Sequence, residues 1–435
     1  MQQTLFILPH WLFSGPLLIA WLVIGLIILI GLFYRHGNTN EAWSFVPVYA
    51  IVAAVIYWII PNLEVPGIDP SDPTGPMIPS GLAIRGYGLF LLTAIVSGVT
   101  LAAWRSSTIG ATSDQIMQLA FWMMICGLAG ARAFYVIQKP EEFFVDGFSM
   151  STLSHVLNMT KGGMVVYGSL IGGSLAGLVF LWFQKMPLLK TADLIAPGMV
   201  LGLAIGRIGC LMNGCCYGGV CEPPYPALHF PAGSPPYMRQ LVEGDLLGID
   251  GLFDESPESE FPLTVESIDA NSIAQQFGLV VGDRVAIRVP SADYFRFQKQ
   301  NPENQQAAEI PIFIDTERTG RISLTLDQLP ARSRPTHPTQ VYSSINALLL
   351  CLLLWYFWTV RRHDGEVFAL MLILYSIARF LIEIVRQDER GQFGTELTIS
   401  QWVSIAMIAI GFALFVYARI AGPQSSPEPD SSGTL

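Results

Sequence analysis

The sequence predicts an all-α polytopic membrane protein with about nine transmembrane helices and one small β-rich insert. Hydrophobic residues make up 51% of the 435 residues and charged residues only 13%, whereas soluble domains carry about 25% charged residues. The apolar residues gather in runs of roughly 20, the length at which a helix crosses a bilayer. A single hydrophilic stretch, about residues 213–336, interrupts these runs.

Nine apolar windows are the candidates for these helices. They lie near residues 11–33, 43–61, 85–104, 115–137, 164–183, 193–212, 338–360, 366–385 and 399–419. The first two form an N-terminal pair within residues 1–61, and the other seven fall within residues 84–238 and 335–420. Residues 421–435 are rich in Ser, Pro and Gly, so we expect a disordered tail.

The distribution of charge predicts the orientation in the membrane. No Lys or Arg precedes the first apolar run, which argues against a signal peptide. Because Arg35 follows that run, we expect the N-terminus outside and the C-terminus in the cytoplasm. The loops expected inside carry Arg35, Arg105, Lys185, Lys190, Arg361 and Arg362, whereas residues 62–83, expected outside, carry no basic residue. The net charge of −10 makes nucleic acid an improbable partner, since phosphate binding needs basic patches.

The insert, residues 239–334, has strand and turn patterns. Residues 263–268 alternate as in a strand, and residues 310–315 and 321–326 predict a hairpin. Residues 272–277 predict a short helix that ends at Gly278. The sequence from Gly278 to Val285 resembles a turn of PDZ domains. We therefore expect a PDZ-like insert, with a generic small β domain as the alternative.

Four charged residues lie inside predicted spans, where charge is costly and needs a reason. They are Arg132, Arg207, Arg379 and Glu383. A structural ion pair between Arg379 and Glu383, four residues apart on one helix face, would explain only two of them. The remaining positive charge predicts an anionic ligand within the bilayer. A lipid phosphate fits, because guanidinium binds phosphate through two parallel hydrogen bonds.

Glycine is concentrated in the residues around Arg207. Residues 202–219 read GLAIGRIGCLMNGCCYGG, and glycines let membrane helices approach closely. They also permit an unwound segment that lines a cavity. Plain helix packing explains the glycines but not Arg207 and Asn213 in the same segment.

Four of the six cysteines lie close together near the expected outer face. They are Cys210, Cys215, Cys216 and Cys221, whereas Cys126 and Cys351 lie in spans and are expected to pack there. One or two disulfides, with three possible connectivities, are plausible in an oxidising compartment. Free thiols are the alternative. Zinc is disfavoured, because the cluster lacks the two-pair spacing of a structural zinc site.

Several blocks, in order along the chain, resemble the prolipoprotein diacylglyceryl transferase family. The blocks are RGYGL at residues 85–89, ARAFYV at 131–136, YGSLIG at 167–172, DLIAP at 193–197, GRIG at 206–209 with Asn213-Gly214 and Gly218, HPTQVY at 337–342, and the stripe of Tyr375, Arg379, Glu383 and Arg386-Gln387. Each block alone is weak, and together they are specific.

The resemblance implies transfer of a diacylglyceryl group from phosphatidylglycerol to the lipobox cysteine of a prolipoprotein, without cofactor or metal. The products are a thioether and glycerol-1-phosphate. It implies a seven-helix core in the bacterial inner membrane, with the active site toward the outer leaflet. The implied catalytic residues are Arg207, Arg379, Tyr167 and Glu383, and the implied phosphatidylglycerol-binding residues are Arg207, Arg379, Arg132, Tyr87, Asn213, Gly218 and Tyr375. Glu383 is expected to orient Arg379 rather than to act as a base.

The chain departs from the family pattern at three positions. Tyr167 stands where the family has the His proposed as base, Cys210 replaces an Asn, and Cys215 replaces a Glu. These departures leave the general base open, and a catalytically inactive lipid-binding homologue stays an alternative. An anion or lipid transporter is a second alternative, since it also suits intramembrane arginines. An intramembrane metalloprotease is excluded because no His-Glu-x-x-His sequence occurs.

Overall fold

The computed structural model describes residues 4–9, 16–36, 53, 65–67, 78–144, 156, 163, 165–221, 225–254, 259–289, 312–325, 328–386, 395 and 397–421. The chain forms two compact units. The larger unit comprises Met1 and residues 90–113 and 187–435, and the smaller unit comprises residues 2–89 and 114–186. Each unit is described by itself below.

Seven helices of the described residues are long and apolar enough to cross a membrane. They are α4 (Gly86–Trp104), α5 (Ser113–Gln138), α8 (Val166–Phe183), α9 (Leu188–Asn213), α13 (Thr339–Val360), α14 (Glu366–Val385) and α15 (Ile399–Ala421). They coincide with the last seven predicted windows. The first window overlaps α2 (Pro16–His36). The second window, apart from residue 53, lies outside the described residues, and so does the predicted tail after Ala421. Of the nine predicted transmembrane helices, seven are therefore present among the described residues.

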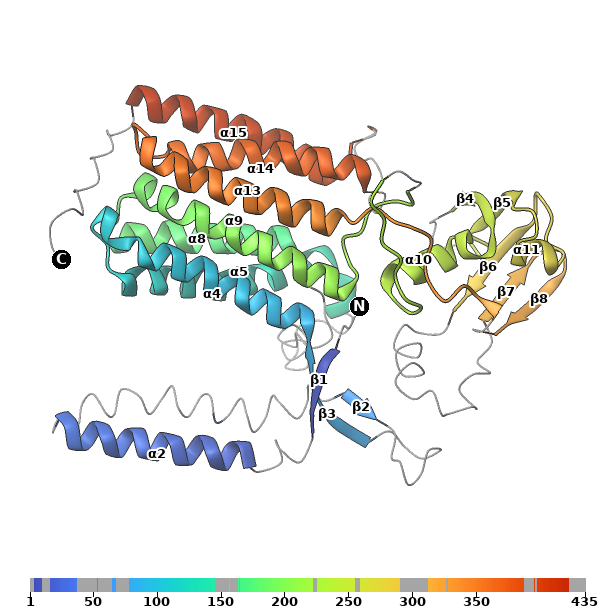
Figure 1. The fold of residues 1–435 in the computed structure, drawn as a ribbon, viewed down its shortest axis with the longest axis horizontal. Coiled ribbons are helices and arrows are strands. Elements are labelled where there is room, and N and C mark those ends of the chain that lie inside the picture. Colours follow the sequence, from blue (N-terminus) through green and yellow to red (C-terminus); the bar gives the residue numbers. More distant parts are fainter. Residues whose placement is uncertain are drawn as a thin grey trace. The chain divides into compact units, whose positions relative to one another are not determined.

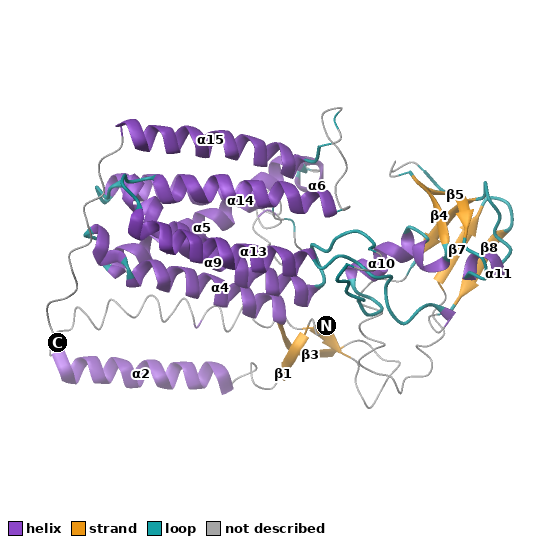
Figure 2. Ribbon diagram, turned by 45° about the horizontal axis from the view of Figure 1, so that its top comes forward, coloured by secondary structure: helices purple, strands orange, loops and turns teal. Residues whose placement is uncertain are grey.

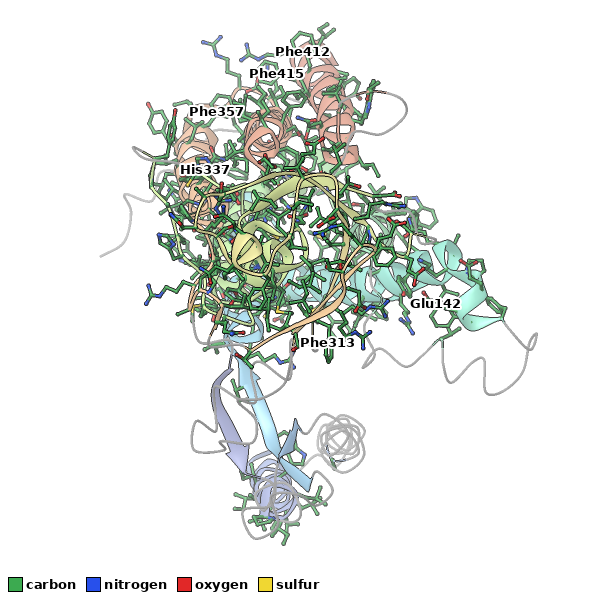
Figure 3. All side chains as sticks on the ribbon, turned by 90° about the vertical axis from the view of Figure 1, so that its right-hand side faces the viewer. Glu142, Phe313, His337, Phe357, Phe412 and Phe415 are labelled. Atoms are coloured by element: carbon green, nitrogen blue, oxygen red, sulfur yellow. The ribbon has the colours of Figure 1, made fainter. Side chains whose placement is uncertain are left out.

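The helices carry large apolar side chains on their outer surfaces, as a lipid solvent requires. Leu349 on α13 is 61% exposed and Phe412 on α15 is 63% exposed. Figure 3 labels Phe412 and Phe415 on α15. In water such exposure would favour aggregation, so these faces fit a bilayer.

In the larger unit, α9 packs against α13, and α14 packs against both α13 and α15 (Figure 1). The last part of α4 crosses α9 at a pair of glycines. A Cβ atom on Gly98 would lie 2.6 Å from the carbonyl oxygen of Gly198, and the reverse distance is 2.5 Å. Only glycine permits this approach. The Gly-rich segment is helical as far as Asn213, so the unwound alternative is wrong for residues 202–213.

A buried polar cluster joins α9 to the connection between α13 and α14. Asp193 is fully buried and accepts hydrogen bonds from the backbone N–H groups of Gly365 (2.7 Å) and Phe368 (2.9 Å). The guanidinium of Arg361 lies 3.7 Å from the same carboxylate. Arg419 of α15 pairs with Glu366, the first residue of α14, which is also fully buried. These contacts tie three helices together at the ends that lie opposite Asn213.

In the smaller unit, α5 and α8 cross at Gly130 and Gly168. A Cβ atom on either glycine would lie 2.4 Å from the backbone oxygen of the other. The short helix α6 (Pro140–Phe143) follows α5. Strands β1 (Thr4–Pro9), β3 (Ile78–Arg85) and β2 (Val65–Gly67) pair antiparallel in that order. The sequence analysis did not predict this sheet, whose strand β1 pairs with β3 more than 70 residues along the chain.

The insert, part of the larger unit, contains an antiparallel sheet of five strands in the order β4-β5-β6-β7-β8 (orange, Figure 2). Their bounds are Ile249–Phe253, Leu263–Ile268, Arg284–Arg288, Ile312–Thr316 and Gly320–Leu324. Helices α10 (Pro235–Val242) and α11 (Ile273–Gln276) accompany the sheet. The predicted strand at 263–268, the short helix and the hairpin are confirmed. The apolar core runs from Tyr237 to Leu329.

Candidate functional site

A cavity in the larger unit lies between α9, α13 and α14. The space within it, part of which opens to the surroundings, is about 290 Å³. Its walls consist of Leu203, Arg207, Ser343, Asn346, Ala347, Tyr375, Arg379 and Ile382. Two arginines therefore line one space whose other lining side chains are apolar or neutral polar. This arrangement can bind an anion with an apolar tail, because the charges are fixed on helices and the walls around them are largely apolar.

Arg379 is held on two sides. Its Nη1 donates to Oε2 of Glu383, one turn further along α14, and its Nη2 donates to the hydroxyl of Ser400 on α15 at 3.0 Å. The Glu383 side chain is 1% exposed. Oε2 of Glu383 also forms an ion pair with Nε of Arg386 at 3.8 Å, and its Oε1 accepts a hydrogen bond from the hydroxyl of Thr398 at 3.4 Å. The carboxylate of Glu383 is thus in contact with Arg379, Arg386 and Thr398.

Arg207 approaches the cavity from α9. It interacts electrostatically with Tyr375 and with the thiols of Cys210 and Cys216, and it experiences the like charge of Arg386. Among the described residues of this region, Arg379 and Arg386 approach the carboxylate of Glu383, and Arg207 lies near Arg386. The positive charge exceeds the negative charge here, which favours an anionic ligand.

The loop after α9 is fastened to the start of α13. Gly214 ends α9 in the left-handed conformation, with φ +76°. The N–H of Gly218 donates to the carbonyl of His337 at 2.9 Å, and a Cβ atom on Gly218 would lie 2.7 Å from Cβ of His337. Gly218 therefore allows the loop to pack tightly. Figure 3 labels His337. Asn213, the last residue of α9, hydrogen-bonds the Cys215 side chain.

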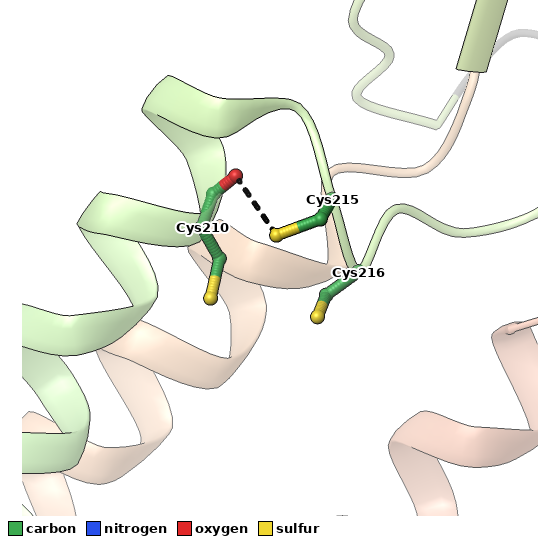
Figure 4. A group of neighbouring side chains, drawn as sticks. All are labelled: Cys210, Cys215 and Cys216. Carbon is green, nitrogen blue, oxygen red and sulfur yellow. Dashed lines mark hydrogen bonds between the residues drawn. The ribbon is translucent and has the colours of Figure 1, made fainter. Parts of the chain in front are cut away.

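Three of the four clustered cysteines converge next to Arg207. The Sγ atoms of Cys210, Cys215 and Cys216 all lie within 4.8 Å of one another (Figure 4). All six cysteines are free, and Cys221 is buried away from the trio, with its Sγ 4.0 Å from the carbonyl of Pro226. Hydrogen bonds from the Cys210 and Cys215 thiols, followed by nearby guanidinium groups, lower the pKa of the Cys216 thiol. The sequence placed these residues together but did not indicate that three of them share one point.

Three of the expected site residues belong to the smaller unit. Arg132 is buried on α5, where Nε donates to the carbonyl of Val156 (2.8 Å) and Nη1 donates to that of Gly163 (2.9 Å). Tyr167 is half-buried at the start of α8, and Tyr87 is 40% exposed at the start of α4. Arg132 thus supports a loop of its own unit.

Sequence reasoning missed several polar residues of the larger unit. Ser343 and Asn346 line the cavity, and Ser400 fixes Arg379. Ser343 and Asn346 lie three residues apart on α13, which could have revealed a polar face on an apolar helix. Gly218 also lines a second cavity, together with Tyr217, Arg239 and Glu243.

Comparison with known proteins gives consistent results. The family model for prolipoprotein diacylglyceryl transferase matches residues 76–417. A phosphatidylglycerol–prolipoprotein diacylglyceryl transferase of Rhodopirellula baltica is 34% identical over all of this chain and 92% of that protein. Enzymes of the same name from Burkholderia multivorans and Clostridium tetani are each 26% identical, over 78% and 77% of this chain and 91% and 93% of their own lengths. The R. baltica alignment includes the N-terminal residues and the insert.

Proposed function

The chain belongs to the prolipoprotein diacylglyceryl transferase family, and from this premise we propose that it transfers the diacylglyceryl group of phosphatidylglycerol to the lipobox cysteine of prolipoproteins. The observation that supports this most is the cavity that Arg207 and Arg379 share. The leaving group, glycerol-1-phosphate, gains negative charge as it departs. Preorganised cations stabilise such charge without reorganisation.

The two arginines have different supports, and this suggests a division of labour. Arg379 is oriented by Glu383 and Ser400, so it is the fixed donor to a phosphate oxygen. Arg207 lies beside Tyr375 and the thiols that follow α9, so it faces the place where the acceptor thiol must approach. The acceptor thiol loses its proton to water, and its sulfur attacks the carbon of the diacylglyceryl group that is bonded to the phosphate oxygen. A carbon–sulfur bond forms as the carbon–oxygen bond breaks, and the electron pair leaves with glycerol-1-phosphate.

The direct test is transfer in vesicles that contain phosphatidylglycerol, with a lipobox peptide as acceptor. We expect a lipidated peptide and released glycerol phosphate, and neither product when the peptide cysteine is serine. Arg207→Ala and Arg379→Ala should each lower the rate by at least the roughly 10²–10³-fold that loss of one charge-stabilising donor costs. Arg288→Ala is the matched control, because Arg288 is a 59% exposed arginine of the insert. A wild-type rate in both cavity variants would refute the assignment.

We further propose that the chain lies in a bacterial inner membrane, with the loop after α9 toward the outer leaflet and the C-terminus in the cytoplasm. In support, Arg105, Lys190, Arg361 and Arg419 gather at the ends of the larger unit's helices opposite Asn213. Arg105 stacks on Trp355 and Trp358, and the others pair with buried carboxylates. This is the bias expected of cytoplasmic ends.

Labelling of intact cells with an impermeant maleimide tests the orientation. An added cysteine at Asp250, which is exposed in the insert, should react, and one at Arg362 should not. The opposite pattern would reverse the topology.

We also propose that residues 239–334 form a PDZ-like domain. β5, the one-turn helix α11 and β6 follow one another as in the PDZ turn pattern, Ser272 caps α11, and Gly278 and Gly282 both have positive φ. An experimental structure of the full chain with a different strand order from PDZ domains would refute this proposal.

A further inference from the structure

The three converging thiols have the geometry of a metal site with one position left open. Zinc binds thiolates at about 2.3 Å, so three sulfurs around one zinc ion lie roughly 4 Å apart. The Sγ atoms of Cys210, Cys215 and Cys216 lie within 4.8 Å of one another, slightly more than that spacing. Catalytic zinc sites use three protein ligands and keep a fourth position for substrate, whereas structural sites fill all four. The sequence lacks the second cysteine pair of a structural zinc site. That absence argues against a four-cysteine structural site but not against a site with three protein ligands.

The backbone holds the three cysteines in this arrangement. Gly214 and Cys216 both adopt left-handed conformations, with φ +76° and +58°, and turn the chain back toward the end of α9. A residue with a side chain pays roughly 1–2 kcal/mol for that conformation, so the surroundings must impose it. The hydroxyl of Thr339 donates to the carbonyl of Cys216 at 2.6 Å, and the amide of Gln340 donates to the carbonyl of Cys215 at 2.7 Å.

The charges around the trio also suit a thiolate-bound cation. Three thiolates and one divalent ion carry a net charge of −1. The guanidinium groups of Arg207 and Arg386 lie close enough to interact with Cys216, and they would compensate that charge. Thiolate ligands favour soft or borderline ions such as Zn²⁺ over Mg²⁺ or Ca²⁺.

We infer that Cys210, Cys215 and Cys216 bind one zinc ion and that its fourth position takes the thiol of the acceptor peptide. The inference rests on the proposed function. A thiol that coordinates zinc is deprotonated outright, and its proton passes to water. The zinc-bound sulfur then attacks the glycerol carbon, the carbon–oxygen bond to phosphate breaks, and zinc keeps its charge throughout.

The first test is zinc binding by the full-length reduced protein in lipid nanodiscs, titrated against a chromogenic chelator. We expect one zinc ion per chain. Cys210→Ser, Cys215→Ser and Cys216→Ser should each weaken binding by at least the roughly 10–100-fold that loss of a ligand-orienting residue costs. Cys221→Ser is the matched control and should bind as the wild type does. Absence of zinc binding, or equal binding by all four variants, would overturn the inference.

The second test asks whether the acceptor thiol becomes a ligand. In protein loaded with Co²⁺, the lipobox peptide should increase the thiolate-to-cobalt charge-transfer absorption, and the same peptide with serine should not. An unchanged spectrum would overturn the thiol-activating role. Transfer at the full rate after zinc removal would also overturn it while the proposed function stands. Normal zinc binding without any transfer would instead refute the proposed function.

Discussion

Replacement of Glu383 by glutamine should disable the site without removing either arginine. The side chain is 1% exposed and its Oε2 contacts Arg379 and, at 3.8 Å, Arg386. At that separation one unit charge interacts with another by about 4 kcal/mol for an effective dielectric constant of about 20. Glutamine keeps the shape but not the charge, so Arg379 loses the partner that fixes it. We expect the transfer rate to fall by roughly 10²–10³-fold, the cost of one misplaced charge-stabilising donor.

The rate is measured with phosphatidylglycerol vesicles and a lipobox peptide, across pH. The proposed role of Glu383 is to orient Arg379 and not to act as the base, and under that role the shape of the pH profile should stay as in the wild type. Glu243→Gln is the matched control, because Glu243 pairs with Arg239 at 2.8 Å with the same i,i+4 spacing but is 35% exposed. That variant should retain the wild-type rate. A wild-type rate in Glu383→Gln would refute the orienting role, and a lost acidic limb of the pH profile would indicate a base instead.

Three further predictions concern stability. Asp193→Ala should lower the free energy of unfolding in detergent by about 3–5 kcal/mol, because buried N–H groups and a guanidinium lose their shared carboxylate; a change below 1 kcal/mol would contradict this. Gly198→Ala should destabilise by about 1–3 kcal/mol, since its Cβ would lie 2.5 Å from a backbone oxygen, whereas Gly206→Ala, with no neighbour within 4 Å, should not. The hydrogen bond from Arg318 lowers the pKa of Asp283, so its stabilisation is complete above the unfolded pKa of about 4 and is lost as pH falls through the lower folded pKa. Hydrogen exchange of residues 263–288 should show this loss, and Asp283→Asn should abolish its pH dependence.

The membrane helices and the family could be predicted because their signals are local. A run of about 20 apolar residues leaves a helix as the simplest way to satisfy the backbone in lipid, and the motif blocks stand in order. The family prediction is confirmed, and so are seven of the nine windows. The excess of intramembrane charge predicted one site for Arg132, Arg207 and Arg379. Arg207 and Arg379 line one cavity, Arg132 belongs to the smaller unit, and the roles of all three stay proposals.

Other features depend on partners far along the chain. Asp193 binds backbone groups about 170 residues away, at Gly365 and Phe368, and no spacing rule links those positions. The thiol trio depends on two left-handed residues, one of them Cys216, which normally disfavours that conformation. Short strands such as β1 gain their partner only through the fold. The contacts of Asp193, the thiol trio and the pairing of β1 all depend on tertiary contacts, so the hydrophobic periodicity of the sequence does not predict them.

The two chain segments that lead into and out of the insert run side by side. The backbone N–H of Cys221 donates a hydrogen bond to the carbonyl of Pro335 at 2.9 Å. Leu228 and Thr336 form an isolated antiparallel β-bridge. Because the segments before and after the insert lie next to each other, the insert, which has its own core, fits between α9 and α13 without separating these two helices. The same geometry would allow the insert to be deleted: a short turn that joins these two neighbouring segments would restore a continuous chain.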